Sequence, residues 1–198
     1  IARLRGAEAV IGVDLVPERL QRAGSRGVRT LDLREHDDVV AAIRDMTGGR
    51  GTDSVIDAVG MEAHGSPATK LAQQAASLLP HVVAEPFMKH ASVDRLHALH
   101  MAIDIARRGG TISLIGVYGG MMDPLPMMTI YDKQLQLRMG QANVPRWVDD
   151  VMPLLLDDSD PLGTEGFASH HLPLQDAPKA YEIFQKKRDG AVKILLQP

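Results

Sequence analysis

Short apolar runs alternate along the chain with longer segments in which apolar residues recur every three or four positions. The short runs are bounded by glycine, proline or acidic residues, which is typical of buried strands. They predict strands at residues 9–13, 28–31, 53–58, 111–115, 134–139, 168–172 and 191–196. The longer segments predict helices at residues 17–23, 66–79, 94–108, 145–156 and 175–187, and another that Asp37 or Asp38 caps and that ends near Met46.

Glycine and proline residues separate most of these segments. Gly109 and Gly110 are expected to end the helix at 94–108, and residues 116–129 to form a loop rich in glycine, proline and methionine. The regular alternation of strand and helix predicts an α/β fold with a doubly wound, mainly parallel sheet. Because such sheets bind ligands at the carboxyl ends of their strands, candidate functional residues are sought there.

The first predicted strand is followed directly by an acidic residue, Asp14. A carboxylate at that place accepts hydrogen bonds from the hydroxyls of an adenosine ribose and repels a 2′-phosphate, so it favours NAD over NADP. Arg19, five residues later, carries a planar guanidinium that can lie against an adenine ring. The alternative interpretation is that Asp14 caps a helix and that Arg19 is a solvated surface residue.

The position of Asp14 also predicts what precedes it. In the dinucleotide-binding fingerprint this acid follows the first glycine of G-x-G-x-x-G by about 20 residues. That count extends beyond Ile1, so residues 1–6 are interpreted as the end of the helix that follows the glycine loop. We therefore expect an N-terminally truncated Rossmann fold without its first strand and glycine loop.

Small residues follow several of the other predicted strands and would let a flat ligand ring approach the backbone closely. Each could equally be part of a tight turn, and a lysine in the last strand could simply be solvated. The candidates for cofactor binding at these places are Val59, Gly60, Gly116, Val117, Gly140, Gln141 and Lys193.

Composition narrows the chemistry further. The 198 residues carry a formal net charge of −3, which disfavours nucleic-acid binding, and they include no cysteine. A thiol nucleophile, disulfides and a zinc site built on thiolates are therefore excluded within this chain. No apolar run reaches the ~20 residues of a membrane span. The eight histidines form no H-E-x-x-H motif, so neither a metal site nor a catalytic residue is expected here.

Several motifs together resemble the zinc-dependent alcohol dehydrogenases of the medium-chain dehydrogenase/reductase superfamily. They are residues 10–14 with 17–20, the glycine-rich residues 47–51, residues 57–60, residues 109–112, and residues 176–181 with 189–193. Residues 60–65, the long insertion up to Arg108 and residues 138–141 are most similar to the formaldehyde dehydrogenase branch.

The resemblance implies a Rossmann domain that follows a catalytic domain of GroES-like fold. Residues 1–167 would be the NAD-binding domain, incomplete at its N-terminus, and residues 168–198 would lie at the junction of the two domains. The full-length protein would use zinc and NAD to transfer hydride between NAD and a small alcohol or aldehyde, with formaldehyde as a candidate. The zinc ligands of this family lie in the other domain, and the glycine loop that cradles the phosphates is expected to be missing. The chain alone is therefore expected to be inactive and to bind NAD weakly.

The resemblance also implies roles for individual residues. Asp14 and Arg19 would bind the adenosine, and Lys193 would contact a phosphate. His64 would also approach the cofactor in this branch. The nicotinamide side would be lined by Val59, Gly60, Gly116, Val117, Gly140 and Gln141. The strand at 134–139 would pair across a two-fold axis, giving a homodimer or homotetramer in the cytoplasm.

Two other functions remain open at this point. An S-adenosylmethionine-dependent methyltransferase also places acids after successive strands, as Asp14 and Asp57 are placed, although the C-terminal motifs do not fit it. A catalytically inactive nucleotide-binding fragment is the other alternative. A binding assay that compares NAD with S-adenosylmethionine distinguishes the dehydrogenase from the methyltransferase. A measurement of dehydrogenase activity distinguishes the enzyme from the inactive fragment.

Overall fold

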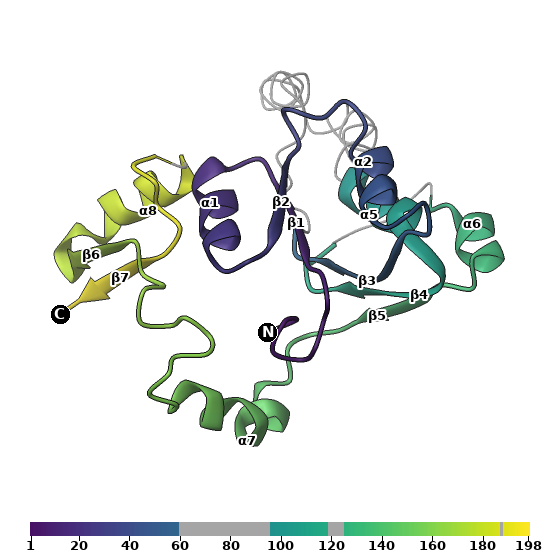
Figure 1. Ribbon diagram of the computed structural model, residues 1–198. Coiled ribbons are helices and arrows are strands. Elements are labelled where there is room, and N and C mark those ends of the chain that lie inside the picture. The colour runs from purple at the N-terminus through teal and green to yellow at the C-terminus, as the bar shows by residue number, and fades with distance from the viewer. Residues whose placement is uncertain (60–95, 119–124, 187) are drawn as a thin grey trace, which may run out of the picture. The chain divides into compact units, whose positions relative to one another are not determined.

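The computed structural model describes residues 1–59, 96–118, 125–186 and 188–198 (Figure 1). Its contacts group the chain into two compact units, residues 1–37 with 143–198 and residues 38–142. Every pair of neighbouring strands among the described residues is parallel. The predicted α/β class with parallel pairing is confirmed, with the strands distributed over three separate hydrogen-bonded sheets. The helix predicted at 66–79 lies outside the described residues.

The first unit starts with a strand, a helix and a second strand that pairs in parallel with the first. These elements are β1 (Ile11–Asp14), α1 (Pro17–Ser25) and β2 (Arg29–Asp32). Proline suits the first turn of α1 because its missing N–H would have no partner there. The chain packs closely at Gly12, where a Cβ would lie only 3.1 Å from the Val28 side chain. All three elements confirm the sequence prediction.

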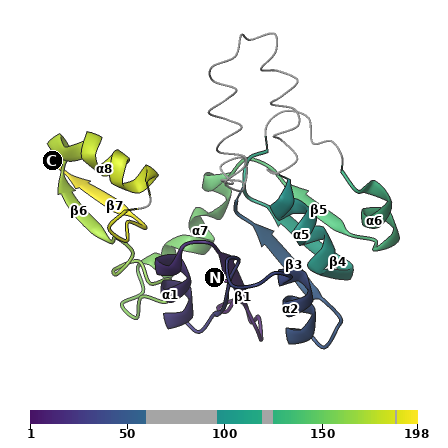
Figure 2. The ribbon, with the colours of Figure 1, turned by 90° about the horizontal axis from the view of Figure 1, so that it is seen from above.

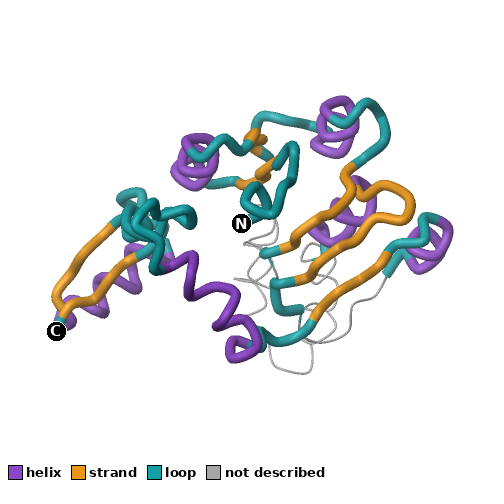
Figure 3. The backbone as a smooth tube through the Cα atoms, turned by 60° about the horizontal axis from the view of Figure 1, so that its bottom comes forward, coloured by secondary structure: helices purple, strands orange, loops and turns teal. Residues whose placement is uncertain are grey.

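The remainder of the first unit holds a long helix and a second pair of parallel strands. Its elements are α7 (Val144–Leu155), β6 (His170–Pro173), a short 3₁₀ turn (Leu174–Asp176), α8 (Ala177–Gln185) and β7 (Ile194–Gln197). Figure 3 shows β6 and β7 side by side with α8 next to them. The Arg22 guanidinium of α1 donates to the carbonyls of Gly166 and Phe167 at 2.7 and 3.0 Å, which ties α1 to the segment before β6.

The second unit is built on a three-stranded parallel sheet in the order β3 (Thr52–Asp57), β4 (Ala106–Leu114) and β5 (Gln136–Met139). The helices α2 (Val39–Met46) and α5 (His97–Ile105) lie next to each other on one side of this sheet (Figures 1 and 2). The predicted apolar stripe of α5 is buried in the core between helices and sheet. The buried core consists of Leu96, Leu99, Ala102, Ile103, Ala106, Ile112, Leu114 and Ile130.

The start of α2 resolves an ambiguity left by the sequence. Of the two candidate caps, the Asp38 carboxylate accepts a hydrogen bond of 2.8 Å from the Ala41 N–H. This bond satisfies one of the backbone donors that the first helical turn leaves without a partner. Val39 and Ile43 lie one turn apart and are 5% and 1% exposed, so the apolar face of α2 is turned inward.

The prediction of a helix from 94 to 108 that ends at two glycines is wrong at its C-terminal end. The helix stops at Ile105, and β4 begins at Ala106. Thr52 pairs with Ala106 and Ser54 with Thr111, so β4 bulges between these two partners and contains Gly109 and Gly110. Gly110 permits this bulge, because a Cβ there would lie 2.8 Å from the Arg107 carbonyl.

The prediction of a continuous loop from 116 to 129 is also wrong at its end. A short helix, α6 (Met127–Asp132), starts directly after Pro126, and residues 119–124 lie outside the described part of the chain. Ile130 is the residue of α6 that joins the core. Packing of a single side chain against α5 and the sheet gives no periodic pattern, so the sequence did not reveal this helix.

Candidate functional site

Asp14 is the last residue of β1 and one oxygen of its carboxylate holds the turn that follows. Asp14 Oδ1 accepts hydrogen bonds from the N–H groups of Leu15 and Val16 at 2.7 and 2.9 Å. Its Oδ2 faces the Arg19 guanidinium at 3.7 Å, and the side chain of Asp14 is 32% exposed. The carboxylate is thus fixed in direction by the backbone while lone pairs remain accessible to a ligand. The structure brings the two predicted adenosine residues, Asp14 and Arg19, together.

A second acidic residue at the same edge escaped the sequence analysis. Asp32 ends β2 directly opposite Asp14, because the two strands are parallel and in register. Arg34 holds the Asp32 carboxylate with its Nε and Nη2 atoms at 2.9 and 2.5 Å, and its own N–H donates to Oδ1 at 2.9 Å. The rule that acids follow strands could have found Asp32, which directly follows the second predicted strand as Asp14 follows the first.

The pairing of Asp32 has a consequence for titration. The hydrogen bonds from Arg34 lower the pKa of Asp32 from 3.8 to about 2, with burial opposing them. Because this folded-state pKa lies below the unfolded value, the pair stabilises the fold above about pH 4 and loses that effect as the pH falls towards 2. A carboxyl NMR titration should place the Asp32 midpoint near 2, and Arg34→Gln should return it towards 3.8.

Arg29→Gln is the matched control for this titration. Arg29 is exposed on β2 and forms no ion pair among the described residues. Its replacement removes the same charge from the same strand and should leave the Asp32 midpoint unchanged. A midpoint near 3.8 in the unaltered protein would contradict the assigned hydrogen bonds.

In the second unit, the carboxyl ends of β3 and β4 are joined by one buried acid, Asp57. It is 4% exposed, and its carboxylate accepts hydrogen bonds from the Val59 N–H at 3.0 Å and the Tyr118 hydroxyl at 2.5 Å. Its carbonyl oxygen accepts hydrogen bonds from the N–H groups of Ile115 and Gly116 at 2.8 and 3.0 Å. Burial and the Asp57 carboxylate both raise the pKa of Tyr118, so the phenol keeps its proton and remains a donor.

Asp57 therefore brings three of the predicted nicotinamide residues together at one edge, namely Val59, Gly116 and Val117. Val117 is 77% exposed and Val59 is 47% exposed, so this edge presents apolar surface to the exterior of the unit. Leu114 and Met139 are register partners of β4 and β5, and Gly140 and Gln141 consequently leave the sheet beside Ile115 and Gly116. The sequence missed Tyr118 because its role depends on a residue 61 positions away.

The other predicted residues fall elsewhere. Gly60 and His64 lie outside the described residues. Lys193 directly precedes β7, whereas the sequence placed it inside the last strand. The strand starts later because the Ser169 hydroxyl accepts hydrogen bonds from the Val192 and Lys193 N–H groups at 3.0 and 3.1 Å. The Lys193 side chain is exposed and forms no ion pair with a carboxylate in the described part of the chain.

The described residues offer neither a metal-binding cluster nor a membrane-spanning helix. In residues 1–59, 96–118, 125–186 and 188–198, no group of three or more His, Cys, Asp or Glu side chains is arranged to hold a metal ion. The helices of those same ranges are all too short or too polar to cross a bilayer.

Comparison with known proteins gives the class. Residues 1–79 match the family model described as zinc-binding dehydrogenase. The alcohol dehydrogenase TADH from Thermus sp. ATN1 superposes with a TM-score of 0.71 at 32% identity, covering 98% of this chain and 45% of that one. The chain corresponds in sequence and fold to the C-terminal portion of the medium-chain dehydrogenases/reductases. Within that superfamily, it is related to the zinc-type alcohol dehydrogenases.

Two curated relatives support this assignment. A zinc-type alcohol dehydrogenase-like protein of Bacillus subtilis is 33% identical over 196 residues, which cover 98% of this chain and 47% of that protein. Formaldehyde dismutase of Pseudomonas putida is 29% identical over 210 residues, covering 100% of this chain and 47% of the dismutase. The chain spans about half the length of the curated relatives it matches. These similarities do not favour the methyltransferase alternative.

Proposed function

We propose that this protein binds NAD and serves as the cofactor-binding part of a zinc-type dehydrogenase that transfers hydride between an alcohol and the nicotinamide. The observation that carries the proposal is the oriented, partly exposed Asp14 carboxylate at the end of β1, beside Arg19. It occurs in a chain that matches the zinc-binding dehydrogenase model over residues 1–79 and superposes on about half of an alcohol dehydrogenase.

The chemistry of Asp14 supports binding of the adenosine part of NAD. An ionised carboxylate accepts but does not donate hydrogen bonds, so the two ribose hydroxyls are suitable partners. The N–H groups of Leu15 and Val16 hold Asp14 Oδ1 and leave Oδ2 toward Arg19 and a ligand. A ribose 2′-phosphate would meet the same negative charge, so NAD is preferred over NADP. Arg19 would lie against the adenine.

The nicotinamide end would use the edge that Asp57 organises. Bound NAD supplies the carbon that accepts or returns the hydride. Val59, Gly116 and Val117 would cover the ring with apolar surface and keep water from it. Gly60, which lies outside the described residues, stays a predicted contact of the ring. Gln141, after Gly140, would offer a side-chain amide to the carboxamide. Asp57 and Tyr118 position this edge through the hydrogen bonds described above.

The zinc chemistry is proposed for the full-length protein and not for this chain. Among the described residues no side chains form a group suited to a metal ion, and the chain has no cysteine. The proposed substrate is a small alcohol or aldehyde. Formaldehyde is the candidate suggested by the relative in Pseudomonas putida, which is a formaldehyde dismutase.

Further expectations belong to the same proposal. Residues 1–167 would form the NAD-binding domain, and residues 168–198 its junction with a GroES-like catalytic domain. Lys193 would contact a phosphate of the cofactor. β5 ends the described three-stranded sheet, and its pairing with a second copy would give a homodimer or homotetramer. A cytoplasmic location is proposed as well.

A ligand-binding experiment tests the proposal. In saturation-transfer NMR on the 198-residue chain with millimolar NAD, saturation of the protein signals should be transferred to the adenine and ribose protons of NAD. The same measurement with S-adenosylmethionine should show none. An assay with NAD and an alcohol should show no turnover by this chain alone, which separates binding from catalysis. Transfer to S-adenosylmethionine without transfer to NAD would overturn the proposal.

A further inference from the structure

A pocket lies at the end of the second unit's sheet opposite to the proposed nicotinamide edge. It has a volume of about 200 Å³, several times the ~30 Å³ of one water molecule in the liquid. Its floor is formed where the loop at Gly51 enters β3 and where Ala106 begins β4. β3 has six residues, so at about 3.3 Å per residue the two edges are separated by roughly 16 Å.

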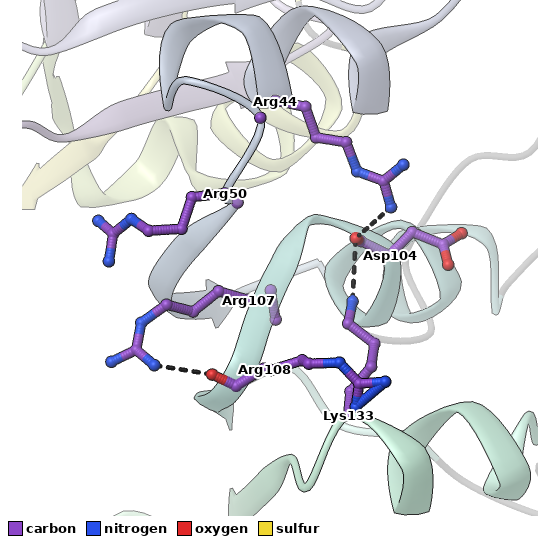
Figure 4. Close-up of a pocket in the computed structure, with 9 residues that line it drawn as sticks. Arg44, Arg50, Asp104, Arg107, Arg108 and Lys133 are labelled. Carbon is purple, nitrogen blue, oxygen red and sulfur yellow. Dashed lines mark hydrogen bonds between the residues drawn. The ribbon is translucent and has the colours of Figure 1, made fainter.

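Five cationic side chains line this pocket, which is called the basic pocket below. They are Arg44, Arg50, Arg107, Arg108 and Lys133. Figure 4 shows that they come from the end of α2, the loop after it, the bulge of β4 and the residue after α6. Segments far apart in the sequence thus bring like charges to one place, which costs free energy unless anions compensate them.

The carboxylates nearby compensate only some of these charges. Arg50 and Arg107 share one carboxylate, that of Asp53, at 2.8 and 2.5 Å. Arg108 pairs with Asp132 at 2.6 Å, and both side chains are about two-thirds exposed, so this pair is weak and open to competition. The sharing of Asp53 leaves one guanidinium charge in excess on that side of the pocket.

Arg44 and Lys133 pair with no carboxylate within the described ranges. Both donate to the carbonyl of Asp104 in the last turn of α5, each at 3.1 Å, and Lys133 also donates to the Ile103 carbonyl at 2.5 Å. Figure 4 shows these two side chains meeting at that carbonyl, while the Asp104 carboxylate points away from them. The neutral carbonyls orient the two cations without cancelling their charge.

The like charges act on one another. Burial lowers the pKa of the Lys133 ammonium, Asp104 raises it, and the positive charges of Arg44 and Arg108 lower it again. A bound anion would relieve this repulsion. Arginine forks and a lysine ammonium are the groups that proteins use most to hold phosphate oxygens.

We propose that the basic pocket binds a phosphate-bearing anion, held by Arg44, Lys133 and Arg108. Arg50 and Arg107 border the same pocket and add positive potential. The ligand is a phosphate or pyrophosphate group, free or carried by a small metabolite. The proposal is independent of NAD binding, because every residue involved lies at the amino edge of the sheet and in one unit.

A surface next to the basic pocket could bind the organic part of a phosphorylated metabolite. Arg108 also lines a second, larger hollow of about 560 Å³ together with Met128, Tyr131, Asp132 and Gln134. Tyr131 is 80% exposed and Met128 is 78% exposed, so an aromatic and a thioether surface adjoin the basic pocket. A nucleobase attached to the phosphates could stack there.

The test is a calorimetric titration of the 198-residue chain with inorganic pyrophosphate. We expect saturable binding of one pyrophosphate, and Arg108→Gln should weaken it about tenfold by removing a charge-assisted contact. Arg44→Gln should do the same, with its melting temperature checked because Arg44 also supports α5. Arg138→Gln is the matched control, since Arg138 is exposed on β5 and does not line the pocket.

The outcomes separate the sources of the ligand. If uridine diphosphate binds more tightly than pyrophosphate and Tyr131→Ala removes this difference, the ligand is a nucleotide. If the two dissociation constants are equal, the pocket recognises the phosphate group alone. Absence of saturable binding would overturn the proposal. So would an equal loss in Arg138→Gln and Arg108→Gln, or binding of an oligonucleotide without binding of pyrophosphate. Failure of the NAD experiment would leave this result unaffected.

Discussion

Asp14→Asn is expected to weaken NAD binding by about 10- to 100-fold. The asparagine side chain keeps an oxygen for the N–H groups of Leu15 and Val16, so the turn after β1 should persist. It loses the negative charge, and hydrogen bonds to a charged group are each worth about 1.5–3 kcal/mol. At about 1.4 kcal/mol per tenfold change, one such bond accounts for the expected loss. The dissociation constant of NAD measured by NMR titration is the readout.

The same substitution should change the preference between cofactors. NADP carries a 2′-phosphate that the Asp14 carboxylate repels, so its binding should weaken less than that of NAD, or improve. Asp150→Asn is the matched control, because it removes one exposed carboxylate of the same unit on α7. Equal NAD affinities in the Asp14 variant and in the unaltered protein would show that Asp14 does not touch the ribose.

Gly51→Ala is expected to lower the free energy of unfolding by about 3 kcal/mol, the largest stability effect that we predict. Gly51 has φ +84°, where an L-residue is strained, and a Cβ would lie 2.5 Å from the Ile105 carbonyl oxygen. That oxygen belongs to the backbone at the end of α5, so it cannot turn aside as a side chain would. The unfolding midpoint should fall by roughly 6–12 °C in a chain of this size.

Gly48→Ala separates the two causes of that effect. Gly48 lies in the same turn with φ +61°, but nothing lies within 4 Å of the position its Cβ would take. The substitution therefore carries only the backbone strain and should cost about 1 kcal/mol. Thermal unfolding followed by circular dichroism compares the two variants, and equal melting temperatures would refute the close approach of Gly51 to α5.

The sequence predicted most strands and helices that the structure describes because their apolar pattern is local. The run before Asp14 and the periodic stripe from Leu96 to Ile103 each contain enough residues to define a period. The same locality placed Asp14 and Arg19 beside each other, since a strand end and the following helical turn are close in sequence as well as in space.

The sequence failed where a conformation depends on distant contacts. It continued α5 through residue 108, whereas pairing of Thr52 with Ala106 and the bulge before Thr111 turn that segment into β4. It missed α6, whose burial rests on Ile130 packing into a core formed by other elements. The roles of Tyr118 and Lys133 also escaped it, because Asp57 and the end of α5 lie far away along the chain.

The sequence by itself determined that this chain is α/β with parallel strands and that its first strand ends in an acid suited to a ribose. It also determined, through the absence of cysteine, that no thiolate zinc site can be built from these residues. Only the tertiary structure decided that Asp57 joins two strand ends and that five cations gather at the opposite edge. Periodicity and turn residues act over a few positions, whereas strand pairing and ion pairing join residues separated by dozens of positions.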